Sequence, residues 1–277
     1  MRLILLTGTS PEGEIQHRHV AQRLAEAYPD ALKAIIVATG VQRSLPEKVR
    51  RWRKRLSNRE IASRLLVRGV HQLTSEAAAK QADLERVLFP AGDPQKMPRQ
   101  DLVRNVASHN SPECRALVAE LKPDIAVVYG TLVIGKALIQ ALPRTLNLHT
   151  GQSPRYRGSD TNFWPIYNRE PQYLGSTVHL LDPGIDSGAI LARGRAAIEP
   201  VETVHSLFGK AVAVGAELLC RAVGRVHDGL AEPQPQDLSQ GREYRSVERS
   251  WAAERRVKQL IAGGILGKGL PAWREEF

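Results

Sequence analysis

Residues 124–129, Asp-Ile-Ala-Val-Val-Tyr, are the segment of this 277-residue chain that most restricts its fold. The run is apolar and contains β-branched side chains, without the polar alternation of a half-exposed strand. Such a run is typical of a central parallel strand that is covered on both faces. Because parallel strands are joined by long crossovers, usually helices, the segment predicts a layered α/β fold.

Strand and helix patterns alternate on either side of this run. Residues 2–7 and 32–39 are predicted as buried strands, and residues 17–28 between them have helical periodicity. Further elements are predicted at residues 111–122 (helix), 134–142 (helix), 146–149 (strand), 161–168 (helix), 176–181 (strand) and 189–198 (strand). Repeated βα units predict a Rossmann-like, doubly wound, mainly parallel sheet with helices on both faces.

The formal net charge of +10 is concentrated between Arg43 and Arg68. This basic stretch is either an electrostatic footprint for a polyanion such as RNA or a solvated helix face. No apolar run approaches the roughly 20 residues that cross a bilayer, so we expect no membrane partner. Cys114 and Cys220 lack the spacing of a zinc site. We expect them to be reduced, in a cytoplasmic protein without a metal.

Two polar side chains stand at the end of the strand predicted at residues 146–149. Asn147 and His149 are two residues apart, so they point to the same face of that strand. Open α/β folds build their active sites at such strand ends. Asp186, in the turn between Gly184 and Gly188, can supply a carboxylate that orients or charges the imidazole. The pattern predicts an enzyme.

Four segments in a fixed order resemble the 10-formyltetrahydrofolate-dependent formyltransferases. They are residues 124–134, Asn147-Leu148-His149, Pro154-Arg155-Tyr156-Arg157-Gly158 and Gly184-Ile185-Asp186-Ser187-Gly188. An isolated Asn-x-His pair would be weak support, whereas the ordered set is specific and covers about a quarter of the chain. Residues 159–164 are more similar to the stand-alone enzymes that act on amino sugars or other small amines.

The resemblance implies a reaction and a set of catalytic residues. A formyl group would pass from 10-formyltetrahydrofolate, the co-substrate, to a primary amine through a tetrahedral intermediate. Asn147 and a protonated His149 would donate hydrogen bonds to the developing oxyanion. Asp186 would hold His149 as imidazolium and help to remove the amine proton. This chemistry requires no metal.

The resemblance also implies two binding sites. The co-substrate would bind to a loop and to a second turn, at Tyr129, Gly130, Thr131, Leu132, Val133, Ile134, Asp182 and Gly184. The acceptor-side candidates are Gly8, Thr9, Ser10, Arg155, Arg157, Asp160, Asn162 and Trp164. The backbone amides of residues 8–10 lie between a strand and a helix, where they can bind an anionic group.

The acceptor is expected to be a small amine, for example a nucleotide-linked amino sugar. Methionyl-tRNA is disfavoured because the roughly 80 residues after Leu191 contain too few predicted strands for the β-barrel of those enzymes. Glycinamide ribonucleotide is disfavoured because residues 150–154 replace that group's Pro-Ser-Leu-Leu-Pro turn. Hydrolysis of the formyl donor and a nucleic-acid-binding module are the alternatives from other classes. Nucleic acid is not expected as a partner, and a homodimer stays open.

These expectations divide the chain into two parts. Residues 1–200 would form the formyltransferase catalytic domain, with a basic helical insertion at about residues 41–100. Residues 201–277 would form a short, mainly helical C-terminal extension that packs on this domain. The helices predicted in the insertion and the extension cover residues 58–70, 75–88, 203–227 and 249–261.

Overall fold

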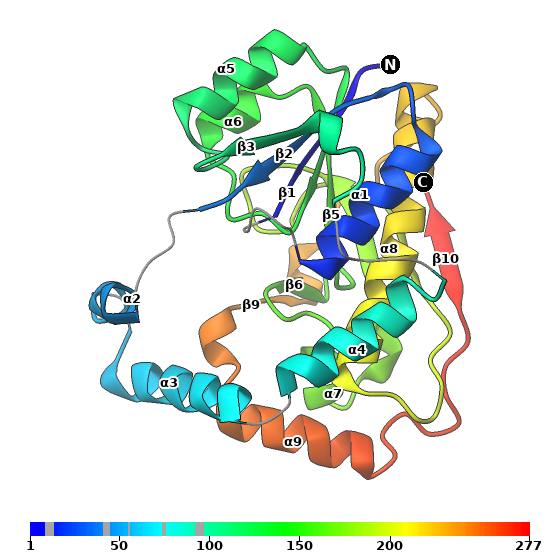
Figure 1. Ribbon diagram of the computed structural model, residues 1–277. Helices are drawn as coiled ribbons and strands as arrows, with labels where there is room; N and C mark the ends of the chain where they lie inside the picture. Colours follow the sequence, from blue (N-terminus) through cyan, green and yellow to red (C-terminus); the bar gives the residue numbers. More distant parts are fainter. Residues whose placement is uncertain (9–13, 41–44, 55, 74–75, 92–96) are drawn as a thin grey trace.

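The computed structural model describes residues 1–8, 14–40, 45–54, 56–73, 76–91 and 97–277 (Figure 1). In this part of the chain, the main sheet has eight strands in the order β10-β8-β7-β5-β4-β1-β2-β3. These strands are β1 (Leu3–Thr7), β2 (Leu32–Ala38), β3 (Val103–Val106), β4 (Ile125–Tyr129), β5 (Arg144–His149), β7 (Ser176–Leu180), β8 (Ile190–Arg195) and β10 (Trp273–Glu276). The strands β3, β2, β1, β4 and β5 are parallel to one another. β7 is antiparallel to β5, β8 is antiparallel to β7, and β10 is antiparallel to β8. The predicted mainly parallel sheet is confirmed.

Helices cover both faces of the sheet, as predicted (Figure 1). The described helices are α1 (Ile15–Ala27), α2 (Leu45–Trp52), α3 (Asn58–Leu73), α4 (Glu76–Leu88), α5 (Pro112–Leu121), α6 (Lys136–Ala141), α7 (Trp164–Tyr167), α8 (Val204–His227) and α9 (Trp251–Ala262). Residues of α1, α4 and α8 share one apolar core with the sheet, and residues of α5 and α6 share another. No described helix is both long enough and apolar enough to span a membrane.

Alternate side chains of the central strands enter these two cores. In β1, Leu3 and Leu5 face the core of α1, α4 and α8, whereas Ile4 and Leu6 face the core of α5 and α6. All four side chains are fully buried. This double burial explains why the central strands are apolar runs rather than alternating ones.

Four short strands were not predicted from the sequence. β3 lies at one edge of the main sheet, and β10 lies at the other edge, antiparallel to β8. β6 (Tyr156–Gly158) and β9 (Arg242–Tyr244) form a separate parallel pair. The residues after 201 therefore contain the expected helices α8 and α9, together with two strands that extend other parts of the fold. The helix predicted at residues 161–168 is limited to the four residues of α7.

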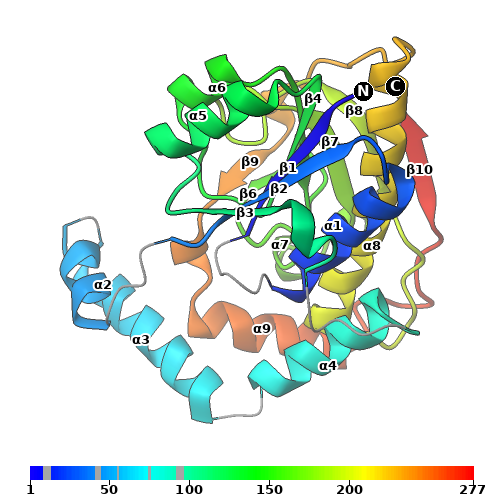
Figure 2. The same ribbon diagram turned by 45° about the horizontal axis from the view of Figure 1, so that its top comes forward.

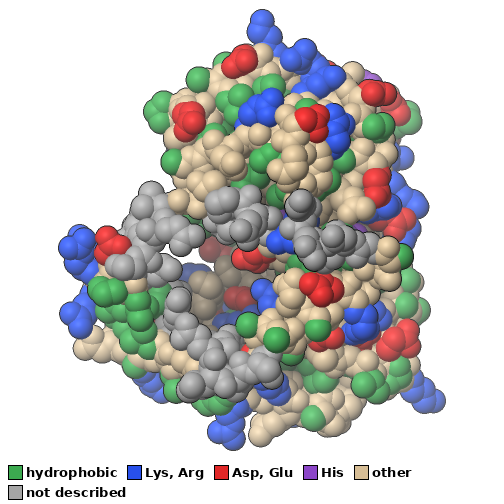
Figure 3. Space-filling model, in the orientation of Figure 1, with side chains coloured by type: hydrophobic (Ala, Val, Ile, Leu, Met, Phe, Trp, Pro, Cys, Tyr) green, Lys and Arg blue, Asp and Glu red, His purple; other side chains and the backbone are tan. Residues whose placement is uncertain are grey.

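The basic insertion is a helical segment of which only the end packs closely on the sheet layers. α4 packs against α1 and α8, whereas α2 and α3 lie apart from the sheet and α3 approaches α9 (Figure 2). The space-filling view shows this face hollowed between the α2–α3 segment and the rest of the molecule (Figure 3).

His19 connects α1 to the end of α4. Its Nδ1 atom lies 2.9 Å from the carbonyl oxygen of Leu88, and its ring meets Phe89 edge-on at a centroid distance of 5.6 Å. Burial lowers the pKa of the His19 imidazole to about 4, although the Leu88 carbonyl acts in the opposite direction.

We expect this histidine to make the protein less stable in weak acid. The unfolded chain binds a proton at His19 near pH 6.5, whereas the folded chain binds it only near pH 4. The stabilisation is therefore complete above about pH 6.5 and is lost as the pH falls toward 4, by up to about 1.4 kcal/mol per pH unit. Urea unfolding of a His19→Asn variant between pH 7.5 and 5 should show a flatter profile than wild type. An unchanged slope would contradict the assignment, and the exposed His227→Asn variant is the control.

Candidate active site

A cavity lies at the carboxyl ends of the parallel strands. The chain order of the strands reverses direction between β1 and β4, which are neighbours in the sheet. Open α/β sheets bind ligands at such a switch point. The cavity measures about 490 Å³ and is lined by the ends of β4 and β5, the first turn of α1, the loop after β7 and residues 243–246.

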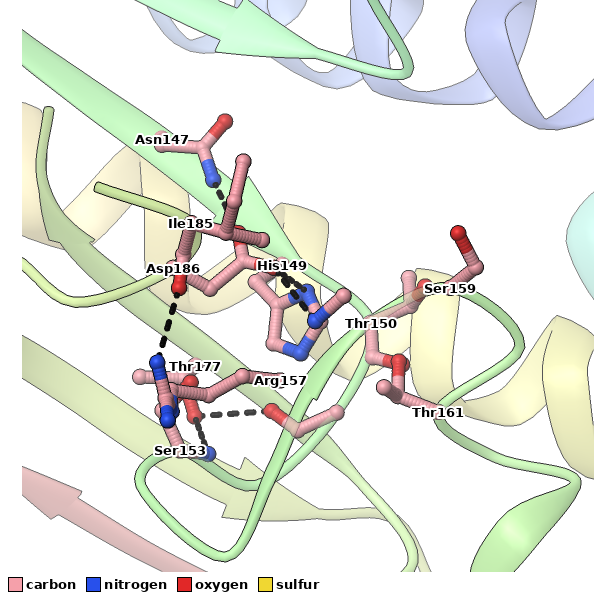
Figure 4. Close-up of polar contacts among 12 residues, drawn as sticks. Asn147, His149, Thr150, Ser153, Arg157, Ser159, Thr161, Thr177, Ile185 and Asp186 are labelled. Carbon is pink, nitrogen blue, oxygen red and sulfur yellow. Dashed lines mark hydrogen bonds and ion pairs between the residues drawn. The ribbon is translucent and has the colours of Figure 1, made fainter. Parts of the chain in front are cut away.

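Asn147, His149 and Asp186 meet in this cavity (Figure 4). Asn147 and His149 project from the same face of β5, and Asp186 reaches them from the loop after β7. The Asp186 Oδ2 atom lies 3.2 Å from His149 Nδ1, and Asp186 Oδ1 accepts a hydrogen bond of 3.2 Å from Asn147 Nδ2. The backbone amide of Gly158 donates a further bond of 2.9 Å to Oδ2. The structure thus brings the three predicted catalytic side chains into direct contact.

Both ring nitrogens of His149 face hydrogen-bond acceptors. Nδ1 faces Asp186, and Nε2 lies 2.8 Å from the carbonyl oxygen of Tyr156. A neutral imidazole has one N–H group, so only the protonated ring can donate to both partners. Burial lowers the pKa of His149 below its ordinary value, and the Asp186 carboxylate and then the Tyr156 carbonyl oppose that effect. The two facing acceptors thus favour the imidazolium that the sequence predicts, whereas burial disfavours it, and the resting imidazolium stays a prediction.

Asp186 itself is held as a carboxylate. Burial disfavours its charged form, but the neighbouring His149 and His179 and the Gly158 amide outweigh this effect. They keep the pKa of Asp186 far below its ordinary range. The pair combines a fixed carboxylate with an imidazole whose proton content can change during a reaction.

His179 is a fourth polar residue of the site that the sequence analysis did not identify. It lies on β7 directly opposite Asn147 of β5, and it is 1% exposed. Its Nε2 atom lies 3.0 Å from Asn147 Nδ2 and 3.4 Å from Asp186 Oδ1. The sequence signal was a single histidine within an otherwise strand-like run, and its position depends on the antiparallel register of β5 and β7.

All eight residues predicted to bind the co-substrate line this cavity. Leu132 and Val133 are 75% and 68% exposed, so they present apolar surface to a ligand in the cavity. Gly130 has a φ of +63° and a Cβ at this position would lie 2.2 Å from His17 Nε2, which explains the glycine. Asp182 accepts hydrogen bonds from the Ser187 hydroxyl and the Gly184 amide, so it organises its own turn.

Several predicted acceptor-side residues lie elsewhere. Arg155 forms an ion pair of 2.6 Å with Glu170 and lines a separate surface pocket. Arg157 donates a 3.3 Å bond to the carbonyl of Ile185, so it supports the loop of Asp186 rather than lining the cavity. Gly8 is buried at the end of β1, and Thr9 and Ser10 lie outside the described residues.

Trp164, Asn162 and Asp160 follow the same turn but have different surroundings. Trp164 is 4% exposed, belongs to an apolar cluster under α9 and stacks on Tyr244 at 5.0 Å, so it packs in the core rather than on a wall of either cavity. Asn162 is buried and bonded to the backbone of Thr150 and Gly175, which uses its polar atoms. Asp160 lines a second cavity, where it pairs with Arg249 at 2.7 Å.

The fold and the site define an open α/β protein of the kind that carries enzyme active sites at its strand ends. Residues 67–223, more than half of the chain, match the family described as Formyl transferase. The chain belongs to this formyl transferase family.

Methionyl-tRNA formyltransferase of Trichlorobacter lovleyi is 35% identical to the chain over 133 residues, which are 47% of this chain and 42% of that protein. The match therefore spans less than half of that relative. Among solved structures, a sugar N-formyltransferase from a Shewanella species has a TM-score of 0.57 at 13% identity, over 94% of this chain and 88% of that one. A 4-N formyltransferase from Francisella tularensis has a TM-score of 0.55 at 12% identity, over 88% and 76%. The two structures share the fold of this chain.

Proposed function

We propose that the protein is an N-formyltransferase that moves a formyl group from 10-formyltetrahydrofolate to the primary amine of a small acceptor. The observation that carries this proposal is the contact of Asn147, His149 and Asp186 at the switch point of a formyl transferase fold. The co-substrate fits the cavity, because Leu132 and Val133 offer an exposed apolar wall to a flat ring system. The co-substrate supplies the formyl carbon.

We propose a role for each residue of the site. The amide of Asn147 lines the cavity, and its two N–H groups face Asp186 Oδ1 and His179 Nε2. It donates to the carbonyl oxygen that becomes negative in the transition state by exchanging one of these two bonds for the new one. The new C–N bond forms as the amine attacks the formyl carbon, and the bond from that carbon to the folate nitrogen breaks. His149 takes up the proton that the amine releases, through water, and passes it to the departing folate nitrogen, while Asp186 stabilises the transient imidazolium. His179 holds Asn147 and Asp186 in position from the neighbouring strand. The site works by aligning two bound molecules and by stabilising charge in a buried space.

A small acceptor is favoured by the second cavity, which lies beside the first and measures about 370 Å³. It is formed by α4, α8 and the segment before α9. We propose a nucleotide-linked amino sugar or a similar metabolite as the acceptor. Methionyl-tRNA is the second candidate, because the related enzyme of Trichlorobacter lovleyi carries that name.

Release of tetrahydrofolate tests the proposal. The protein is incubated with 10-formyltetrahydrofolate and, in separate reactions, with nucleotide-linked amino sugars, glycinamide ribonucleotide or methionyl-tRNA. We expect release that depends on a nucleotide-linked amino sugar and yields its formamide. Equal release without any amine would identify a hydrolase instead, and no release with the whole panel would refute both activities.

A further inference from the structure

The second cavity adjoins the catalytic cavity. Both are lined by Thr150, which follows His149, and by Phe208 of α8. The remaining walls of the second cavity come from α4, residues 160–163, the start of α8 and Arg249. A molecule that lies across the boundary at Thr150 and Phe208 would contact both cavities.

Among the described residues, Lys80 is the one cation of the second cavity that lacks a partner. Glu76 is paired with His205 at 3.2 Å and with Lys258 at 2.7 Å. The other charged residues, Asp160 and Arg249, are paired with each other. Lys80 on α4 is half-buried and makes no hydrogen bond or ion pair within the described chain. A partly buried ammonium without a carboxylate attracts an anionic group of a ligand.

A second unpaired polar atom lies in the catalytic cavity. Gln16, in the first turn of α1, is 6% exposed, and its Oε1 atom is buried without a hydrogen-bond partner in the described chain. Its Nε2 group donates to the Glu14 carboxylate, which only accepts, so the orientation of the amide is fixed. Oε1 is therefore an acceptor that remains for an N–H or O–H group of a ligand.

The two unpaired groups belong to one region of the molecule. The Lys80 charge acts on both His17, which follows Gln16, and His205, which lines the second cavity. In His17 it adds to burial, the larger cause, which lowers the pKa to about 4. Lys80 thus lines the second cavity within electrostatic range of the first turn of α1, which lines the catalytic cavity.

We propose that the amine acceptor lies across the boundary at Thr150 and Phe208. Its phosphate group binds Lys80, and a hydrogen-bond donor next to its amine binds Gln16 Oε1. This inference rests on the proposed formyl transfer and adds the residues that would bind the acceptor, Lys80 for its phosphate and Gln16 for the part next to its amine. A cavity of about 370 Å³ lies within the range of pockets that bind small molecules.

Equilibrium binding tests the phosphate subsite without turnover. The probes are UDP, dTDP and inorganic pyrophosphate, titrated calorimetrically into the wild-type chain, a Lys80→Gln variant and the exposed control Lys268→Gln. We expect Lys80→Gln to weaken nucleotide binding about 10- to 100-fold, as for the loss of a charge-assisted hydrogen bond, and Lys268→Gln to leave it unchanged. If pyrophosphate binds as tightly as the nucleotides, the subsite binds the phosphate groups and gains no affinity from the nucleoside. Absence of binding, or equal binding to Lys80→Gln, would overturn the proposal.

A second variant tests Gln16 in the formyl transfer assay. We expect Gln16→Leu to raise KM for the acceptor about tenfold, with kcat and the Kd for tetrahydrofolate close to wild type. An unchanged acceptor KM would remove Gln16 from the subsite. The experiments distinguish failure of this inference from failure of the proposed function. Nucleotide binding that depends on Lys80, without any formyl transfer, would refute only the proposed function. Transfer to amines without a phosphate, unaffected by Lys80→Gln, would refute only the phosphate subsite.

Discussion

We expect the Asp186→Asn variant to lose formyl transfer by about 10³-fold in kcat while remaining folded. The carboxylate places one oxygen against His149 Nδ1 and the Gly158 amide, and the other against Asn147 and His179. An asparagine keeps one oxygen for the first pair, but it removes the charge that stabilises a protonated His149. The loss should therefore appear in the chemical step.

The backbone conformation at residue 186 is compatible with asparagine, so the variant is expected to fold. Asp186 has a φ of +48°, in the left-handed region that asparagine tolerates well. Steady-state kinetics and thermal unfolding measure activity and stability separately. Asp124→Asn is the matched control, because its carboxylate is 57% exposed at the opposite end of β4. More than a tenth of wild-type kcat in Asp186→Asn would contradict the proposed role of the carboxylate, and His149→Ala should be at least as inactive.

The second large effect is expected for Gly151→Ala. A Cβ atom at this position would lie 2.5 Å from His149 Nε2 and 2.5 Å from Thr161 Cβ, closer than real contacts allow. The methyl group would have to displace the His149 ring from the Tyr156 carbonyl. Because a displacement of about 1 Å can cost about 100-fold in rate, we expect kcat to fall by about that factor.

Kinetics of Gly151→Ala should be read together with its thermal unfolding and its tetrahydrofolate affinity. We expect the affinity to change little, since the atoms nearest to the new methyl group belong to His149 and Thr161 and not to the apolar wall at Leu132 and Val133. Gly69→Ala is the control, because nothing lies within 4 Å of a Cβ there. Wild-type kcat in Gly151→Ala would show that the space around His149 can adapt.

The parts of the fold that the sequence predicted are those with local signals. Within the run at residues 124–129, Ile125–Tyr129 are buried on both faces, which explains why these five residues are apolar. Asn147 and His149 could be paired from one strand alone, because a spacing of two residues fixes their common face. Asp186 was found through the glycine turn around it and through the family resemblance.

The elements and residues that the sequence did not predict depend on pairings between segments that are far apart in the chain. β10 has the sequence Trp-Arg-Glu-Glu, and an edge strand with charged side chains lacks the apolar pattern of an inner strand. His179 reaches the site only because the antiparallel register places it opposite Asn147. The sequence could not decide the surroundings of Trp164, since an aromatic residue after a catalytic turn has the same pattern whether it faces a ligand or packs on Tyr244.

The pairing of β6 with β9 has a consequence for biosynthesis. β6 follows the catalytic strand closely in the chain, whereas β9 is made only after the whole of α8. Residues 243–246 form one wall of the catalytic cavity, so a growing polypeptide that already contains Asn147, His149 and Asp186 still has an open site. The ribosome must release the strand at Arg242–Tyr244 before that wall can form. The catalytic cavity can therefore form only after residues 242–246 have been synthesised.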